Sequence, residues 1–211
     1  MVVAVVLIAV NANAQFGIKA GYVSTAFKEK GGGESYRHRP MDGVKVGLDY
    51  DIMFGRSGVS FRPGVNYIYF GDSEKMDGIT DQQRYHFLNV PLDFKYALDL
   101  GRECSIYAFV GPKLVLGMAG KDTYKGDGFK YVTDTFSGEF TAEEDGASEK
   151  GHEHALLNRF DVQVGAGLGF QFYGVSLEFG YDWGMLNLSK HVRDDYSIKR
   201  DQISATLGYT F

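Results

Sequence analysis

The most regular feature of the chain is a strict alternation of apolar side chains with polar or small ones. From Phe160 to Phe172 every even-numbered residue is apolar, and every odd-numbered residue is aspartate, glutamine or glycine. Successive side chains of a β-strand point to opposite faces. A period of two sustained over this segment therefore predicts a long strand with one apolar and one polar face.

The same alternation recurs elsewhere and predicts eight strands. They are residues 15–24, 43–54, 59–70, 86–98, 104–118, 160–172, 175–188 and 202–211. In the segment 104–118 both sets of positions are apolar around Tyr107 and Val110, so the pattern does not say which set faces inward. No helical period is found after residue 14, and the predicted fold class is all-β.

Short and long connections alternate between these strands. Residues 55–58, 99–103 and 173–174 form tight links of the kind found in hairpins. The long links are 25–42, 71–85, 119–157 and 189–201. Outer-membrane barrels have short periplasmic turns and longer external loops, whereas a soluble barrel has no reason to sort its connections by end. This alternation of short and long connections predicts an eight-stranded antiparallel up-and-down transmembrane β-barrel.

The number of apolar side chains indicates which face points outward. About five to seven apolar positions per strand amount to roughly 45 side chains, and the interior of an eight-stranded barrel holds little more than its own side chains or one small ligand. The apolar face is therefore expected to contact lipid, where a closed sheet satisfies every backbone group. Aromatic residues near strand ends, such as Phe16 and Phe172, suit the interfacial girdles of such barrels.

The first fourteen residues are expected to be an export signal. The apolar run from Met1 to Val10 is followed by Ala12-Asn13-Ala14, a small-residue cleavage pattern. The run is shorter than the roughly 20 residues of a transmembrane helix. Basic residues before the run are missing, so we expect the reading frame to begin farther upstream. The expected domains are the signal at 1–14 and the barrel at 15–211.

Composition and charge restrict the partners. The chain has 22 basic and 27 acidic residues and a net charge of −5, so nothing favours nucleic acid. The single Cys104 forms no internal disulfide. The long link 119–157 carries four lysines against nine carboxylates. Such a run is ordinarily just solvated, and the alternative is an external loop that binds a divalent cation or a surface partner.

The polar faces of the strands predict charges inside the barrel. In so narrow a lumen these charges should pair, because an unpaired buried charge is costly. A nearly neutral, ion-paired plug favours a structural barrel over an open pore. The predicted lumen network is Lys19, Lys45, Asp49, Asp51, Arg62, Asp93, Lys95, Arg159, Asp161, Glu178 and Asp182.

Two groups of residues could indicate catalysis or metal binding. His152-Glu153-His154 offers two imidazoles and a carboxylate, but it lacks a third fixed ligand for a metal. His86, His191 and several serines are present without the G-x-S-x-G context of a hydrolase. We therefore expect no enzyme activity, no metal and no cofactor.

Several motifs resemble a known family. The segment from His86 to Tyr96, HFLNVPLDFKY, is similar to a strand of the porin-family (PorT-like) outer-membrane β-barrel domain. Further matches are Gly111–Lys113, Asn158–Val162 with Gly165-x-Gly167-x-Gly169, Tyr181–Asn187 and Leu207–Phe211. The resemblance covers 15–211 and implies the fold more than the function. Tyr209 and Phe211 are similar to the terminal aromatic signal that the outer-membrane assembly machinery recognises.

These observations predict a non-enzymatic outer-membrane barrel that contacts membrane lipid. It would act through its external loops in surface interaction or envelope integrity. One alternative is a narrow porin-like channel for small solutes. Another is a soluble exported ligand-binding barrel, which is excluded if the apolar face contacts lipid.

Overall fold

The computed structural model describes residues 14–55, 57–76, 78–144, 147–190 and 196–211. The expected export signal lies outside these residues except for Ala14, so its cleavage stays a prediction. Within the described residues, no helix is long and apolar enough to cross a membrane.

The described chain consists of β-strands and their connections. The strands are β1 (Ala14–Gly31), β2 (Glu34–Arg37), β3 (Met41–Met53), β4 (Val59–Met76), β5 (Ile79–Gly101), β6 (Cys104–Lys125), β7 (Phe129–Asp134), β8 (Glu139–Glu144), β9 (Ala147–His152), β10 (Phe160–Phe172), β11 (Val175–Gly184) and β12 (Ser197–Thr210).

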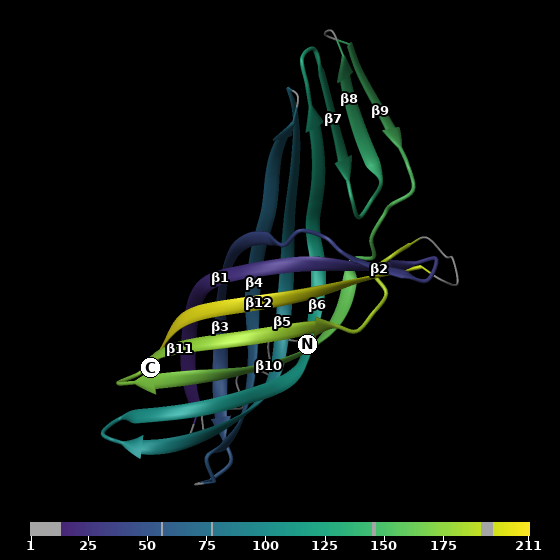
Figure 1. Cartoon of the computed structure of the whole chain (residues 1–211). Helices are drawn as coiled ribbons and strands as arrows, with labels where there is room; N and C mark the ends of the chain where they lie inside the picture. Colours follow the sequence, from purple (N-terminus) through teal and green to yellow (C-terminus); the bar gives the residue numbers. More distant parts are fainter. Residues whose placement is uncertain (1–13, 56, 77, 145–146, 191–195) are drawn as a thin grey trace, which may run out of the picture.

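Eight of these strands form a closed antiparallel ring in the order β1, β3, β4, β5, β6, β10, β11 and β12 (Figure 1). Pairing of β6 with β10 joins the two halves, and pairing of β12 with β1 closes the ring. Each strand of the ring is antiparallel to both neighbours. The predicted eight-stranded up-and-down barrel is confirmed.

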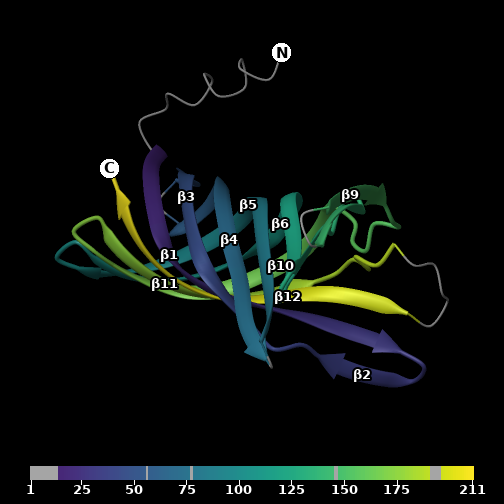
Figure 2. The same cartoon turned by 90° about the horizontal axis from the view of Figure 1, so that it is seen from above.

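The tight links and both ends of the described chain lie at one end of the barrel. The start of β1 lies beside the C-terminus (Figure 2), and Gly17 pairs with Thr210. In the link between β10 and β11, Tyr173 and Gly174 both have positive φ, 48° and 81°. Positive φ at both central residues is the turn type whose twist matches a two-residue hairpin.

At the other end the strands run beyond the predicted boundaries. β1 continues to Gly31, β4 to Met76 and β6 to Lys125. The predicted loop 119–157 is therefore not loop throughout, because it contains the end of β6 and the hairpin strands β7, β8 and β9. The predicted strand 175–188 is shorter, since β11 ends at Gly184.

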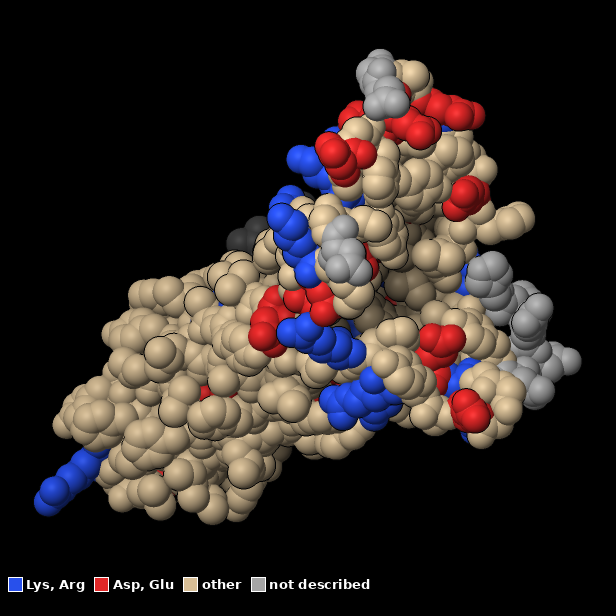
Figure 3. Space-filling view, turned by 45° about the horizontal axis from the view of Figure 1, so that its top comes forward, with Lys and Arg blue, Asp and Glu red and all other residues tan. Residues whose placement is uncertain are grey.

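The apolar set of most strands points away from the barrel axis, and large apolar side chains are exposed over the outer surface. The space-filling view shows this surface almost free of charge, with Lys, Arg, Asp and Glu gathered at one end of the molecule (Figure 3). The structure also answers the question left open for the segment 104–118. Tyr107, Phe109 and Lys113 face inward, whereas Ile106 and Val110 face outward.

A cluster of buried apolar side chains closes the end of the barrel opposite the tight links. Phe70 stacks on Phe87 with ring centroids 5.5 Å apart, and Phe27 lies 5.8 Å from Tyr85. The full cluster is Val23, Phe27, Met41, Ile68, Phe70, Tyr85, Phe87, Val115, Phe136, Leu157 and Leu188. The lumen is therefore polar near the tight links and apolar at its mouth.

Candidate functional site

Charged side chains from neighbouring strands meet in the lumen near the tight links. Lys19 Nζ lies 2.7 Å from Asp49 and 3.8 Å from Glu178. Arg62 pairs with Glu178 and lies 3.8 Å from Asp93. Two further ion pairs are Lys95–Asp51 and Lys113–Asp182. Among these contacts, the Arg62–Glu178 pair joins β4 and β11, which lie on opposite sides of the ring.

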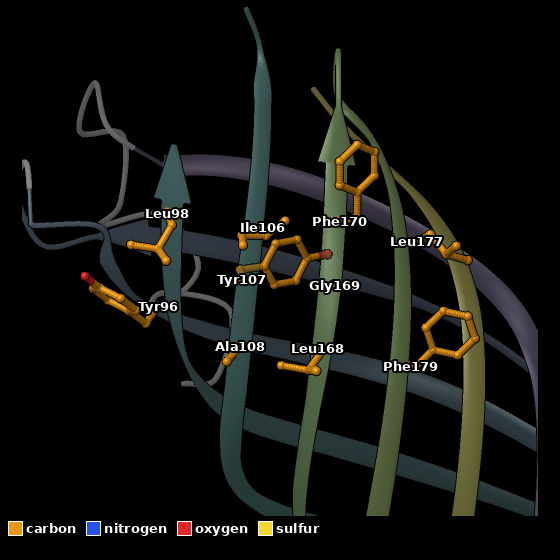
Figure 4. Close-up of a pocket in the computed structure, with 10 residues that line it drawn as sticks. All are labelled: Tyr96, Leu98, Ile106, Tyr107, Ala108, Leu168, Gly169, Phe170, Leu177 and Phe179. Carbon is orange, nitrogen blue, oxygen red and sulfur yellow. The ribbon is translucent and has the colours of Figure 1, made fainter. Parts of the chain in front are cut away.

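Aromatic rings fill the lumen beside these charges. The guanidinium carbon of Arg62 lies 4.9 Å from the centre of the Phe109 ring. Tyr107 donates a hydrogen bond of 2.9 Å to Glu178. Glycines of β10 provide the space for both rings, because a Cβ at Gly167 would lie 2.3 Å from Phe109 and one at Gly169 would lie 2.2 Å from Tyr107. Figure 4 shows the Tyr107 ring crossing from β6 toward Gly169.

A second charged layer lies between this network and the apolar mouth. Arg200 and Asp161 are both fully buried, with Nε and Oδ2 3.6 Å apart. The guanidinium carbon of Arg200 lies 4.1 Å from the centre of the Phe87 ring. Gln163 donates a hydrogen bond of 3.0 Å to the backbone carbonyl of Arg200. This layer connects the ion pairs below with the aromatic cluster above.

The residues between the tight links and the ion pairs enclose little free space. A cavity of about 10 Å³ is lined by Lys19, Asp49, Arg62, Tyr107 and Glu178 among others. A water molecule needs a cavity of about that size. Side chains therefore fill the described lumen at this end.

Phe136 covers the mouth of the barrel from the connection between β7 and β8. Its ring meets that of Phe87 edge-on, with centroids 5.8 Å apart. A Cβ at Gly117 would lie 2.4 Å from the Phe136 ring, so the glycine permits the close approach. Lys190 donates a hydrogen bond of 3.2 Å to the Phe136 carbonyl, which ties this connection to the segment that follows β11.

The structure brings ten of the eleven predicted lumen residues into the barrel interior and places Arg159 elsewhere. Arg159 is exposed, donates a hydrogen bond of 3.1 Å to the Met118 carbonyl and lies over the Phe136 ring. It precedes β10, at the barrel rim. Lys45 does lie in the lumen, where it donates a hydrogen bond of 3.1 Å to Ser204.

Sequence reasoning missed two cations of the lumen. Lys113 was overlooked because the facing of its strand was ambiguous. Arg200 lies before the predicted start of the last strand at 202. Arg200 lies two residues before Gln202 and therefore belongs to the same inward-facing, even-numbered positions as Gln202 and Ser204. Extending the predicted alternation by two residues would have found it.

The other candidate residues lie away from the lumen. His152 and His154 are exposed, and among the described residues no three His, Cys, Asp or Glu side chains could together hold a metal. His86 lies on the outer surface, with Nδ1 2.5 Å from the Tyr67 hydroxyl. Phe211 is exposed at the tight-link end, with its ring 5.0 Å from that of Tyr209.

An apolar groove lies on the outer surface near the tight links (Figure 4). It has a volume of about 470 Å³ and crosses β5, β6, β10 and β11. The small side chain of Ala108 leaves the hollow between Tyr96 and Leu168. The groove belongs to the apolar exterior, and no polar side chain converges on it.

Beyond the mouth, part of the ring continues as a projecting sheet (Figure 1). We define the projecting sheet as residues 72–76, 79–84, 121–125, 129–134, 139–144 and 147–152, from β4 to β9. Within the described residues β9 pairs with β8 alone, so its other edge is free.

Comparisons with known proteins agree with this architecture. The model of the outer membrane protein beta-barrel domain matches residues 11–190. Neisserial surface protein A is similar in structure, with a TM-score of 0.53 and 13% identity over 94% of this chain and 99% of that chain. The attachment invasion locus protein Ail of Yersinia pestis, in complex with the heparin analogue sucrose octasulfate, gives 0.50 and 15% over the same shares.

A search of curated proteins found no match. Identities this low show a shared fold and nothing further about activity. The family match covers most of the chain and agrees with the closed ring, the apolar exterior and the sorted connections. The chain therefore belongs to the family of outer-membrane proteins with a β-barrel domain, and its place is the outer membrane.

Proposed function

We propose that this barrel is closed and non-enzymatic, and that it acts at the cell surface through its projecting sheet. The observation that supports this proposal is that lumen side chains fill the barrel while β4, β5 and β6 continue past its mouth. The long connections of such barrels face outward, so the projecting sheet is the part that a partner can reach.

The inner face of the projecting sheet, which continues the barrel interior, favours a cationic partner. Cross-strand neighbours share a face, so the register assigns each charge to one side of the sheet. On the inner face the charged residues of the sheet are all acidic: Asp72, Glu74, Asp81, Asp122, Glu144 and Glu149. The free edge of β9 adds backbone groups that can pair with an extended segment. A divalent cation is the alternative ligand.

Conductance separates this proposal from a channel. Purified protein in a planar bilayer should show no large, stable single-channel current, because ion pairs and aromatic rings occupy the lumen. A large and stable conductance would overturn the closed barrel and favour a narrow channel for small solutes.

Excision of β8 and β9 tests the sheet without disturbing the mouth. Glu153 N donates a hydrogen bond of 2.7 Å to the Gly138 carbonyl, and a β-turn places this bond between its first and fourth residues. Replacing 139–152 with Asn-Gly should therefore close the chain while Phe136 stays in place. This variant should fold and lose affinity for a fluorescent oligolysine.

Charge neutralisation on one pair of strands provides the matched control. Glu144→Gln with Glu149→Gln removes two charges from the inner face of β8 and β9, and Glu139→Gln with Glu143→Gln removes two from the outer face of β8. Only the first pair should weaken oligolysine binding. Equal loss from both pairs would contradict recognition by the inner face, and titration with calcium tests the alternative ligand.

Two narrower assignments also stay proposals. The HFLNVPLDFKY segment supports kinship with PorT-like barrels within the wider family. The exposed pair Tyr209 and Phe211 supports recognition by the outer-membrane assembly machinery.

A further inference from the structure

The outer face of the projecting sheet carries the opposite charge. By the strand register this face holds six basic residues: Lys75, Arg84, Lys121, Lys125, Lys130 and Lys150. It also holds three acidic residues, Asp134, Glu139 and Glu143, and His152. Asp134 accepts backbone hydrogen bonds from Phe136 and Ser137, and Glu143 lies 3.5 Å from Lys130. The face therefore has an excess of three basic residues, although Asp134 lies across from Lys121 on β7.

Like charges lie directly opposite one another on this face. Arg84 is the cross-strand neighbour of Lys121, and Lys125 that of Lys130. Like charges in such positions destabilise a sheet. Among the ion pairs of the described residues, none includes Arg84, Lys121 or Lys125. These side chains are exposed, and an external anion would relieve their repulsion.

The position of the basic face indicates where that anion comes from. The outer face of the sheet continues the lipid-facing surface of the barrel past a β-bulge in β6 between Gly117 and Ala119. On β5, Leu88, His86 and Arg84 are successive outward-facing positions, each two residues from the next along the strand. In Figure 3 Lys and Arg side chains line one side of the projecting part, Asp and Glu gather at its tip and other side, and both signs meet at its base beside the uncharged barrel surface.

We propose that the basic face, led by Arg84 and Lys121, binds the phosphate groups of anionic lipid headgroups in the same membrane. The apolar exterior ends where the headgroup layer begins, so the first basic residues lie at phosphate depth. Each Lys or Arg near an anionic surface contributes enough to change the association about 5-fold. The contact holds the projecting sheet against the membrane and leaves its acidic face turned away from the lipid.

Adjacent reporters on opposite faces test this contact. In a Cys104→Ala background, Thr123→Cys places a nitroxide on the basic face and Tyr124→Cys places one on the acidic face. The protein is placed in nanodiscs of phosphatidylcholine, and the share of phosphatidylglycerol is then raised. Access of an aqueous nickel relaxant should fall at position 123 and stay unchanged at position 124. Equal change at both positions, or no change at 123, overturns the proposal.

Charge variants and salt identify the interaction. Arg84→Gln with Lys121→Gln should weaken the association of the projecting sheet with the anionic bilayer about 25-fold. The fall in relaxant access at position 123 should then be absent up to equimolar phosphatidylglycerol. Lys30→Gln with Arg37→Gln removes the same charge from the β1–β2 hairpin and should leave that fall intact. If the first variant does not fold, the labelled protein with Arg84 and Lys121 intact decides the question, because 1 M salt reduces the screening length to about 3 Å and should reverse the protection.

A final arm separates lipid from free phosphate. Inorganic phosphate added to phosphatidylcholine nanodiscs should leave position 123 accessible. Protection by free phosphate at millimolar concentration, equal to that by the anionic bilayer, would show an anion site unrelated to lipid and overturn the membrane assignment.

Discussion

The pair of Asp161 and Arg200 gives the sharpest test of the closed lumen. Both side chains are fully buried, and Asp161 is the carboxylate in ion-pair contact with Arg200. Asp161→Ala therefore leaves a guanidinium in the barrel interior without its counter-charge. Arg159→Ala, two residues earlier, is the matched control, because Arg159 is exposed at the rim and forms no ion pair with any residue that the structure describes.

The expected magnitude follows from burial. Removing one partner of a buried pair costs about 3–5 kcal/mol, and 1.4 kcal/mol changes an equilibrium constant tenfold. Arg200 keeps its contact with the Phe87 ring at 4.1 Å, which contributes about 2 kcal/mol when desolvated. We therefore expect a loss near 3 kcal/mol for Asp161→Ala. The loss for Arg159→Ala should be about 1 kcal/mol, the value of an ordinary hydrogen bond.

Urea unfolding in lipid vesicles measures both losses, with the fluorescence of Trp183 as the signal. The chain has one tryptophan, and it lies on the outer surface of β11. The double variant Asp161→Leu with Arg200→Met should recover most of the stability, since apolar replacement of a buried pair is often neutral or favourable. If Asp161→Ala and Arg159→Ala cost the same, water reaches Arg200 and the description of a sealed lumen is wrong.

Three further predictions concern the exterior, a turn and pH. Leu168→Arg places a charge on the lipid-facing surface and should cost about 2–4 kcal/mol of membrane stability, seen as lost heat-modifiable mobility on gels, whereas Ser148→Arg on β9 should assemble normally. Glu103→Gly should raise the free energy of unfolding by about 1 kcal/mol and so raise the urea midpoint, because Glu103 has a φ of 59° that favours glycine; an unchanged or lower midpoint would contradict strain at this turn. Hydrogen bonding from Tyr196 holds the pKa of Glu29 below its usual value, so its stabilising contribution is present above the unfolded pKa and is lost as pH falls through the folded pKa. The hydrogen-exchange protection factor at the end of β1, which corrects for the intrinsic pH dependence of exchange, should then fall in acid, and Glu29→Gln should remove that fall.

The fold was predictable because its signal is local. Alternation within each segment reports two chemically different faces, and the lengths of the links report which ends carry tight turns. Boundaries were less predictable. Beyond the membrane both faces of β4, β5 and β6 become polar, so the alternation disappears while the backbone pairing continues. The strands of the 119–157 segment carry mixed charges and were therefore interpreted as loop.

The lumen was predicted as a set of residues but not as a set of contacts. The polar parity identified Lys19, Arg62 and Glu178, yet it could not show that Arg62 bridges Glu178 and Asp93 from three different strands. The alternation also assigned Arg159 to the lumen network, because it extends one residue past the start of the strand. The structure shows that β10 begins at Phe160, and Arg159 turns to the rim.

The alternation along the chain is enough to predict a membrane barrel with an apolar exterior, because side-chain direction along a strand depends on neighbours in the chain. The tertiary structure decided how the charges are grouped, because pairing depends on the register between strands that are distant in sequence. The acidic 119–157 segment shows the difference. Its sequence shows only a net negative charge, whereas the pairing of β4 to β9 places every basic residue of the sheet on the outer face and leaves only acidic residues among the charged ones of the inner face.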